Sequence, residues 1–134
     1  MITQLVQRVY NALINSGNIT YVVFPAAAVS VTAPAGAGGW ANGAYIEIVA
    51  TVGAADVWLT SVSFENPALV TQMEVDISTG AAFAVVRATL PVVDASYTLP
   101  FPLRIVAGTR VGARNRAVAA LATIDVKIGC AVGV

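Results

Sequence analysis

The sequence predicts an all-β domain of about seven to nine strands, a sandwich or a small barrel, behind a short N-terminal helix or arm. Helical spacing of apolar residues occurs only in the first segment, and from residue 19 onward β-branched and aromatic runs alternate with turn residues. The 134 residues fit one domain and are too few for two ordinary ones. We therefore divide the chain into a helix or arm over residues 1–18 and a β domain over residues 19–134.

The N-terminal segment has a single apolar face. The residues that share it are Ile2, Leu5, Val6, Val9 and Leu13. An Asn-Ser-Gly-Asn run at residues 15–18 is typical of a helix end. A helix this short is marginal alone, so its apolar face must pack on its own domain or on another protein. Both interpretations stay open, and Leu5, Val9 and Leu13 are candidate interface residues.

The strands that follow are separated by Gly, Pro and Asn turn signals. They are expected at residues 19–24, 44–52, 56–65, 70–78, 82–90, 99–106, 110–117 and 121–132. The connection over residues 25–43 is rich in Gly, Ala and Pro, and it has room for one short strand near residues 29–32.

Alternation of apolar and polar residues indicates which strand faces are buried. Met73, Val75 and Ile77 share one face of their strand, whereas Glu74 and Asp76 share the other, which is typical of a strand with one solvated face. The spacing of the two carboxylates, about 7 Å, is also that of a glycosidase pair. A solvated strand shows the same pattern, so we expect no catalytic role.

Two other strands carry apolar residues in informative patterns. In the last strand, Ile124, Val126, Ile128 and Cys130 share a face, so Cys130 is expected to be a small buried residue and not a reactive thiol. The strand over 56–65 has apolar residues on both faces, which indicates a central strand or one covered by a neighbouring subunit. Its two faces are expected to be Trp58, Thr60, Val62 and Phe64 on one side and Val57 and Leu59 on the other.

The composition argues against several classes of function. Charged residues make up 10% of the chain, against about 25% in a typical soluble domain, so much of the surface is uncharged polar or is covered by other protein. Seven basic and seven acidic residues cancel, which disfavours binding to nucleic acid or to an anionic membrane. The chain has no histidine. Because histidine is the commonest general base and zinc ligand, we expect no enzyme, no metal and no cofactor.

The N-terminal third also bears on location. The stretch between Arg8 and Glu47 has no charge, but Pro, Gly and Asn residues interrupt it. We therefore expect neither a membrane-spanning helix nor a secretory signal, and we expect synthesis in the cytoplasm. The single cysteine cannot form an internal disulfide.

Arg104, Arg110, Arg114 and Arg116 are the candidate contact residues of the second half. The last three share a strand face. If their strand forms a hairpin with the last strand, Arg114 lies near Asp125 as a cross-strand ion pair. Alternatively, the arginines meet carboxylates on another chain, because the planar guanidinium suits bidentate contact. These two interpretations stay open together.

Trp40 and Trp58 are the aromatic candidates, either as core or interface residues or as platforms on which a sugar stacks. Six short runs of the chain form a recognisable series: WANGAYIEIVA at 40–50, VWLTSV at 57–62, ENP at 65–67, MEVDISTGAA at 73–82, LPFPLRI at 99–105 and AGTRVGAR at 107–114. On these runs most of the chain, residues 40–132, resembles a β-sandwich module of tailed-bacteriophage virion proteins that includes capsid cement, or decoration, proteins and head-fibre-like proteins.

The resemblance implies a jelly-roll-like antiparallel β-sandwich that forms homotrimers on the outer capsid surface and holds neighbouring major capsid subunits together. It implies no active site. Residues 1–43 show no clear match, so they form either an arm or part of the sandwich. The alternative function is a receptor- or glycan-binding β-sandwich module of a head fibre or tail fibre.

Overall fold

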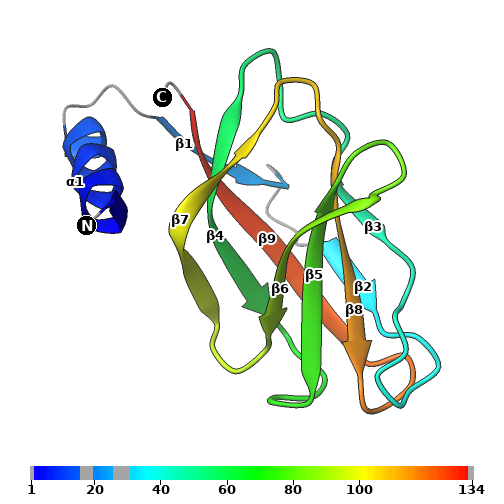
Figure 1. The fold of residues 1–134 in the computed structure, drawn as a ribbon. Helices are drawn as coiled ribbons and strands as arrows, with labels where there is room; N and C mark the ends of the chain where they lie inside the picture. Colours follow the sequence, from blue (N-terminus) through cyan, green and yellow to red (C-terminus); the bar gives the residue numbers. More distant parts are fainter. Residues whose placement is uncertain (1, 16–19, 26–30, 133–134) are drawn as a thin grey trace.

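Two antiparallel β-sheets pack face to face, and an N-terminal helix lies beside them (Figure 1). The structure is a computed structural model that describes residues 2–15, 20–25 and 31–132. Its elements are α1 (Ile2–Asn15), β1 (Thr20–Phe24), β2 (Val31–Pro34), β3 (Ile46–Val49), β4 (Val57–Glu65), β5 (Met73–Thr79), β6 (Val85–Pro91), β7 (Ser96–Ile105), β8 (Val111–Ala117) and β9 (Thr123–Val132). The predicted all-β sandwich with a short N-terminal helix is confirmed.

The strand order is that of a jelly roll. One sheet has the order β1-β9-β4-β7, with β2 also pairing with β9, and the other has the order β3-β8-β5-β6. The pairs are nested: β1 and β2 pair with β9, β3 with β8, β4 with β7, and β5 with β6. This is the pattern of one long antiparallel hairpin rolled into two layers. Because β1 and β2 belong to the first sheet, residues 20–24 and 31–34 are part of the sandwich and not of an arm.

The core lies between the two sheets and follows the predicted alternation. Met73, Val75 and Ile77 of β5 are at most 1% exposed. The inward residues of β9 are completely buried, and they are Ile124, Val126, Ile128 and Cys130. Both predictions are confirmed, including the buried position of Cys130. Its burial raises the pKa of the thiol to about 12, so the sulfur stays protonated at neutral pH.

The predicted faces of β4 are wrong in part. Val57, Leu59, Val62 and Phe64 all face the core. Against β9 the register shifts between Leu59 and Ser61 so that β4 has one residue more than its partner, and Thr60 is the extra residue of a β-bulge. A bulge exchanges the two faces of a strand, so the inward residues are Val57 and Leu59 before Thr60 and Val62 and Phe64 after it. Strand β4 is central in its sheet, as one of the two interpretations expected.

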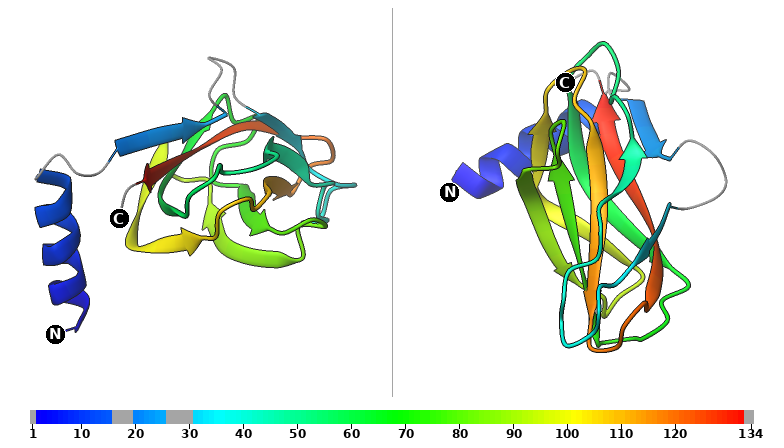
Figure 2. Two further views of the ribbon diagram at one scale, coloured as in Figure 1. Left: turned by 90° about the horizontal axis from the view of Figure 1, so that it is seen from above. Right: turned by 90° about the vertical axis from the view of Figure 1, so that its right-hand side faces the viewer.

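Helix α1 stands to one side of the sandwich, as Figure 1 and the left view of Figure 2 show. It contacts the sandwich mainly at β7. A shallow hollow of about 200 Å³ lies between them, and among the described helix side chains Gln7 lines it, opposite Tyr21, Thr60 and Leu99. The helix thus presents a polar residue to its own sandwich.

Candidate functional site

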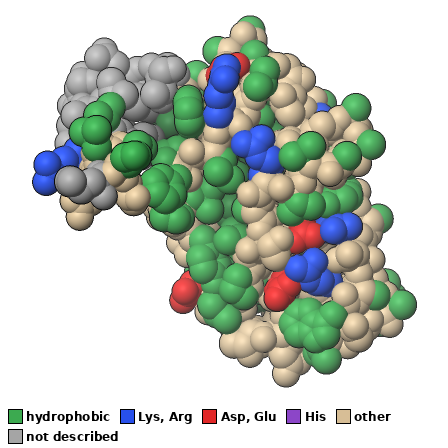
Figure 3. All heavy atoms as spheres, viewed as in Figure 1, with side chains coloured by type: hydrophobic (Ala, Val, Ile, Leu, Met, Phe, Trp, Pro, Cys, Tyr) green, Lys and Arg blue, Asp and Glu red, His purple; other side chains and the backbone are tan. Residues whose placement is uncertain are grey.

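The outer face of the second sheet carries a row of charged residues from β5 and β8, and Figure 3 shows basic and acidic side chains alternating there. Asp76 of β5 is at its centre and is only 3% exposed. Its carboxylate accepts hydrogen bonds from Arg114 Nε at 2.8 Å, from Arg116 Nη1 at 3.3 Å and from Thr89 Oγ1 at 2.7 Å. The prediction that this face is solvated is therefore wrong for Asp76, because side chains from both neighbouring strands cover it.

The pairing of strands β5 and β8 decides which charges meet. Asp76 lies directly opposite Arg114, and Glu74 lies directly opposite Arg116. Arg116 Nε donates to Glu74 Oε2 at 2.7 Å, so Arg116 bridges both carboxylates. Arginine therefore engages both members of the carboxylate pair considered above.

The predicted pairing of Arg114 with Asp125 is wrong. Their strands, β8 and β9, belong to different sheets and do not form a hairpin. Asp125 instead accepts a hydrogen bond from Thr32 Oγ1 at 2.5 Å and one from Asn66 Nδ2 at 3.0 Å. These two hydrogen bonds lower the pKa of Asp125 below its ordinary value.

Aromatic rings cover two of the arginines. The guanidinium of Arg114 lies 4.8 Å from the ring centre of Tyr45, and that of Arg110 lies 4.3 Å from the ring centre of Phe83. Contacts of this kind hold an arginine by cation–π attraction. Gly112 makes room for the Phe83 ring, because a Cβ on residue 112 would come within 2.6 Å of that ring. Arg110 also forms a salt bridge with Glu47 of β3.

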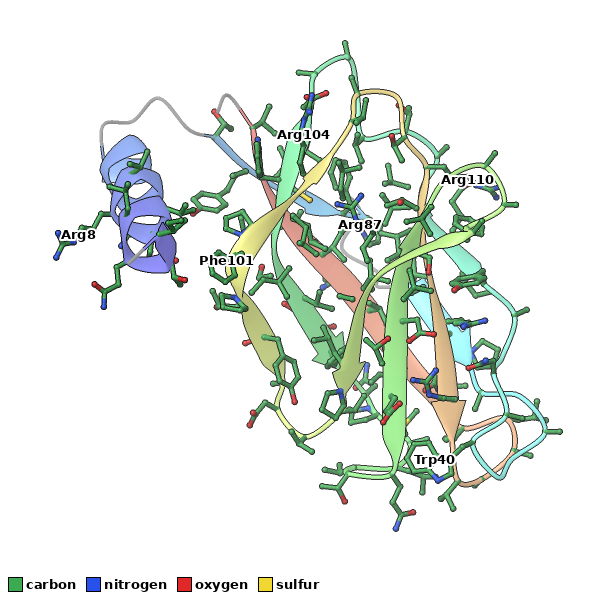
Figure 4. The ribbon with its side chains drawn as sticks, viewed as in Figure 1. Arg8, Trp40, Arg87, Phe101, Arg104 and Arg110 are labelled. Carbon is green, nitrogen blue, oxygen red and sulfur yellow. The ribbon has the colours of Figure 1, made fainter. Side chains whose placement is uncertain are left out.

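Arg104 lies away from this row, on the edge strand β7, as Figure 4 shows. It forms a salt bridge with Asp56 at the start of β4. The backbone N–H of Ala107 donates to the same carboxylate at 2.8 Å. These contacts lower the pKa of Asp56, the Ala107 hydrogen bond first and the Arg104 hydrogen bond second. Each candidate arginine therefore has a carboxylate partner within its own chain. The partner of Arg114 is Asp76 and not the expected Asp125.

Trp40 and Trp58 are not brought together. Trp40 is 44% exposed in the connection before β3, with a left-handed φ of 66°. Its backbone N–H donates to the Ala117 carbonyl at 2.9 Å, which holds the connection against the end of β8. Trp58 is half-buried on β4 of the other sheet, directly opposite Arg104. The two rings therefore do not form one binding platform.

The apolar face of α1 is uncovered. Leu5 is 61% exposed and Val9 is 51% exposed, and Ile2 and Val6 beside them are also exposed. The side chain of Leu13, the third candidate of this helix, lies outside the described residues. Arg8 is the charged residue of the helix and points away from the sandwich in Figure 4.

The part of the chain that the structure describes includes no group of three or more Cys, Asp, Glu or His side chains placed to hold a metal ion. No helix within this part is long and apolar enough to cross a membrane. No known family model, curated protein or solved structure matches the chain.

Proposed function

We propose that this chain is a structural protein of a tailed-phage virion. It acts as a capsid cement, or decoration, protein: it binds the outer capsid surface as a homotrimer, contacts the major capsid protein and stabilises the expanded shell. The observation that carries the proposal is the uncovered apolar face of α1, which belongs to a helix set apart from a complete sandwich. The resemblance of residues 40–132 to virion β-sandwich modules supports the same assignment.

The helix needs a protein surface that its own sandwich does not offer. An isolated helix of this length is marginal in water, and most of the stability of such helices comes from packing of the apolar face. Ile2 is 80% exposed and Leu5 is 61% exposed, so the gain from burying them is still available. The helix is therefore a binding element, directed at another subunit or at the shell.

The sandwich, in contrast, is suited to a rigid building block. Its charged residues are few, and the ones on its strands are largely paired within the chain, as with Arg114 and Asp76. A surface of this kind offers few charges that must lose water when it meets another subunit. The low charge content of the sequence has a physical reason in a protein that buries much of its surface in an assembly.

A cement protein works through mass action. A protein that binds only the expanded shell lowers the free energy of that shell by RT ln(1 + [L]/Kd) at each site, about 2.7 kcal/mol when the protein is in hundredfold excess over Kd. Because a shell offers many equivalent sites, these increments add up against the internal pressure of the genome.

The first experiment is the mass of the purified full-length chain, measured by light scattering behind a sizing column. A homotrimer has a mass of about 41 kDa, three times the 13.7 kDa of the chain. We expect this mass to persist at about 0.5 M NaCl, because apolar burial is screened far less by salt than surface charge. A monomer of 13.7 kDa would contradict the proposed trimer.

The second experiment tests the location. Shells assembled from the major capsid protein of the same genome are sedimented with the chain before and after expansion, and we expect binding to the expanded shell. The exposure of Trp40 favours the alternative function, a receptor- or glycan-binding module, because an exposed tryptophan can stack on a sugar. Binding on a glycan array that Trp40→Ala abolishes, with no binding to shells, would replace the cement function by a receptor- or glycan-binding one.

A further inference from the structure

A small apolar pocket lies where the β6–β7 turn meets the connection from β4 to β5. Its volume is about 160 Å³, and its lining includes Phe64, Val70, Val92 and Val93. Val70 is 60% exposed and Val93 is 50% exposed, so the rim is open to solvent. An apolar cavity of roughly 150 Å³ holds a ligand as large as benzene, so this pocket has room for one branched aliphatic side chain.

One wall of the pocket carries a carboxylate, that of Asp94. The other described Asp and Glu side chains form a salt bridge or accept hydrogen bonds within the chain. Asp94 stands apart from them, because neither kind of contact to its carboxylate is formed among the described residues. The pocket therefore combines an apolar interior with a negative charge that has no partner among the described residues.

Helix α1 has the complementary features. Leu5 and Arg8 are one helical turn apart and, with Ile2 and Gln4, they line a hollow on the helix surface. Arg8 is the cation without a partner among the described basic residues, since Arg87 donates to the Arg104 carbonyl and the others pair with carboxylates. The helix thus offers an aliphatic side chain beside a positive charge that has no partner among the described residues.

The helix does not reach this pocket in its own subunit. Figure 1 shows the β6–β7 turn at the bottom of the sandwich, whereas the helix lies beside the upper half. Among the described side chains of the helix, Gln7 lines the hollow against Tyr21 and Thr60. Occupation of the pocket therefore requires a helix from another copy.

From this complementarity we infer that α1 of one subunit docks on the β6–β7 turn of a second copy of this chain, with Leu5 in the apolar pocket and Arg8 paired with Asp94. The inference rests on the proposed homotrimer and specifies how it is held together. Donor and acceptor surfaces differ, so the contact is heterologous, and a heterologous contact that repeats with threefold rotation closes a ring.

Cross-linking between two variants, each with one introduced cysteine, tests the contact. Gln4→Cys places a thiol beside Leu5 and Arg8 without altering them, and Ala95→Cys places one on the pocket wall. Native Cys130 is buried and its pKa is raised, so it does not compete. The two variants are co-expressed with different tags and treated with a short bis-maleimide. We expect a covalent dimer that contains one chain of each tag.

The matched control replaces Ala95→Cys by Ala82→Cys, which is also an exposed turn alanine but lies between β5 and β6. It should give at least tenfold less mixed dimer. Equal cross-linking of both alanine positions, or cross-linking of Gln4→Cys mainly to itself, would overturn the docking. If light scattering still gives the trimer mass in that case, the homotrimer stands and only this contact fails.

Charge exchange tests the ion pair separately. Arg8→Asp and Asp94→Arg each place like charges together, so each should weaken self-association about fivefold to tenfold per contact. The double variant restores opposite charges and should return the association close to that of the native chain. Single variants that associate as tightly as the native chain, or a double variant weaker than either single one, would contradict the pairing of Arg8 with Asp94.

Discussion

Asp76 holds together more of the second sheet than any other described acidic side chain. It accepts from Thr89 on β6 and from Arg114 and Arg116 on β8, so a single carboxylate on β5 links three strands. It is 3% exposed, whereas the two arginines keep about a quarter of their side chains in contact with solvent. A buried charge is tolerated only when it is paired in this way, and removal of one partner leaves the others uncompensated.

We therefore expect Asp76→Ala to destabilise the fold by about 2–4 kcal/mol, somewhat less than for fully buried pairs because the arginines stay partly hydrated. The control is Glu47→Ala, which removes the carboxylate that pairs with Arg110 and is more exposed than Asp76. It should lower the free energy of unfolding by about 1 kcal/mol or less. Urea unfolding followed by tryptophan fluorescence measures both. Equal losses for the two variants would show that burial of the carboxylate does not set the cost.

At the scale of single residues, the sequence predicts which face of a strand a side chain occupies better than it predicts that side chain's ion-pair partner. The shared face of Arg114 and Arg116 follows from alternation alone. Their partners depend on which strand lies beside β8, and the short connection after residue 117 suggested β9. The chain instead crosses to the other sheet there, so the carboxylates come from β5. Strand order is a property of the whole sandwich, and a local pattern does not contain it.

Among the elements, α1 and the sandwich differ in what stabilises them. The strands are tied into sheets by backbone hydrogen bonds and by a common core, whereas the helix touches the sandwich mainly at β7. Folding of the sandwich should therefore be nearly independent of the helix. Self-association should depend on it.

A chain that begins at residue 19 separates the two roles. We expect it to fold with an unfolding free energy within about 1 kcal/mol of the full chain, because few apolar contacts to the helix are lost. We expect its mass in light scattering to be that of a monomer. A truncated chain that fails to fold would show that the helix is a structural part of the sandwich, and one that remains trimeric would place self-association on the strands.

A full-length variant keeps the chain intact as a second measure. Leu5→Gln with Val9→Gln removes the apolar face, while glutamine retains good helix propensity. It should behave as the truncated chain does in light scattering.

Strand positions were predictable to within a few residues, and the exceptions have physical causes. Strand β4 changes faces at Thr60, the extra residue of its bulge against β9, and a bulge adds one residue without changing the kind of residue that the strand contains. Strand β7 begins at Ser96, before the predicted start at residue 99. Pro100 and Pro102 lie inside both the predicted and the observed strand, and they are tolerated there because β7 is an edge strand.

For the molecule as a whole, two aspartates outside the second sheet connect separate segments of the chain through hydrogen bonds. Asp56, at the start of β4, accepts from the backbone N–H of Ala107 in the connection from β7 to β8. Asp125 of β9 accepts from Thr32 of β2 and from Asn66 after β4. Both have a pKa below the ordinary value of 3.8, because their hydrogen bonds favour the charged form.

The sign of the pH dependence follows from these lowered pKa values. A carboxyl whose pKa is lower in the folded state stabilises the fold above the pKa of the unfolded chain, and this contribution is lost as the pH falls through the folded value. We expect the melting temperature to fall as the pH drops below 3.8, followed by circular dichroism between pH 7 and pH 2. The double variant Asp56→Asn, Asp125→Asn should have a flatter profile. A profile as steep as that of the native chain would contradict the assignment.

Nested strand pairing brings the two ends of the sandwich to the same place. Thr20 and Val132 lie opposite each other in the register of β1 and β9, so the first and last paired residues of the sandwich are neighbours. A short peptide could therefore join them, and the chain could be opened at a distant turn without breaking any strand pair. For protein engineering, the same closeness means that a domain fused after the last strand begins beside the start of β1, the strand that follows the helix in the sequence, and the helix is the element that we expect to do the binding. The β5–β6 turn, which lies between strands of the other sheet, is the better position for displayed cargo.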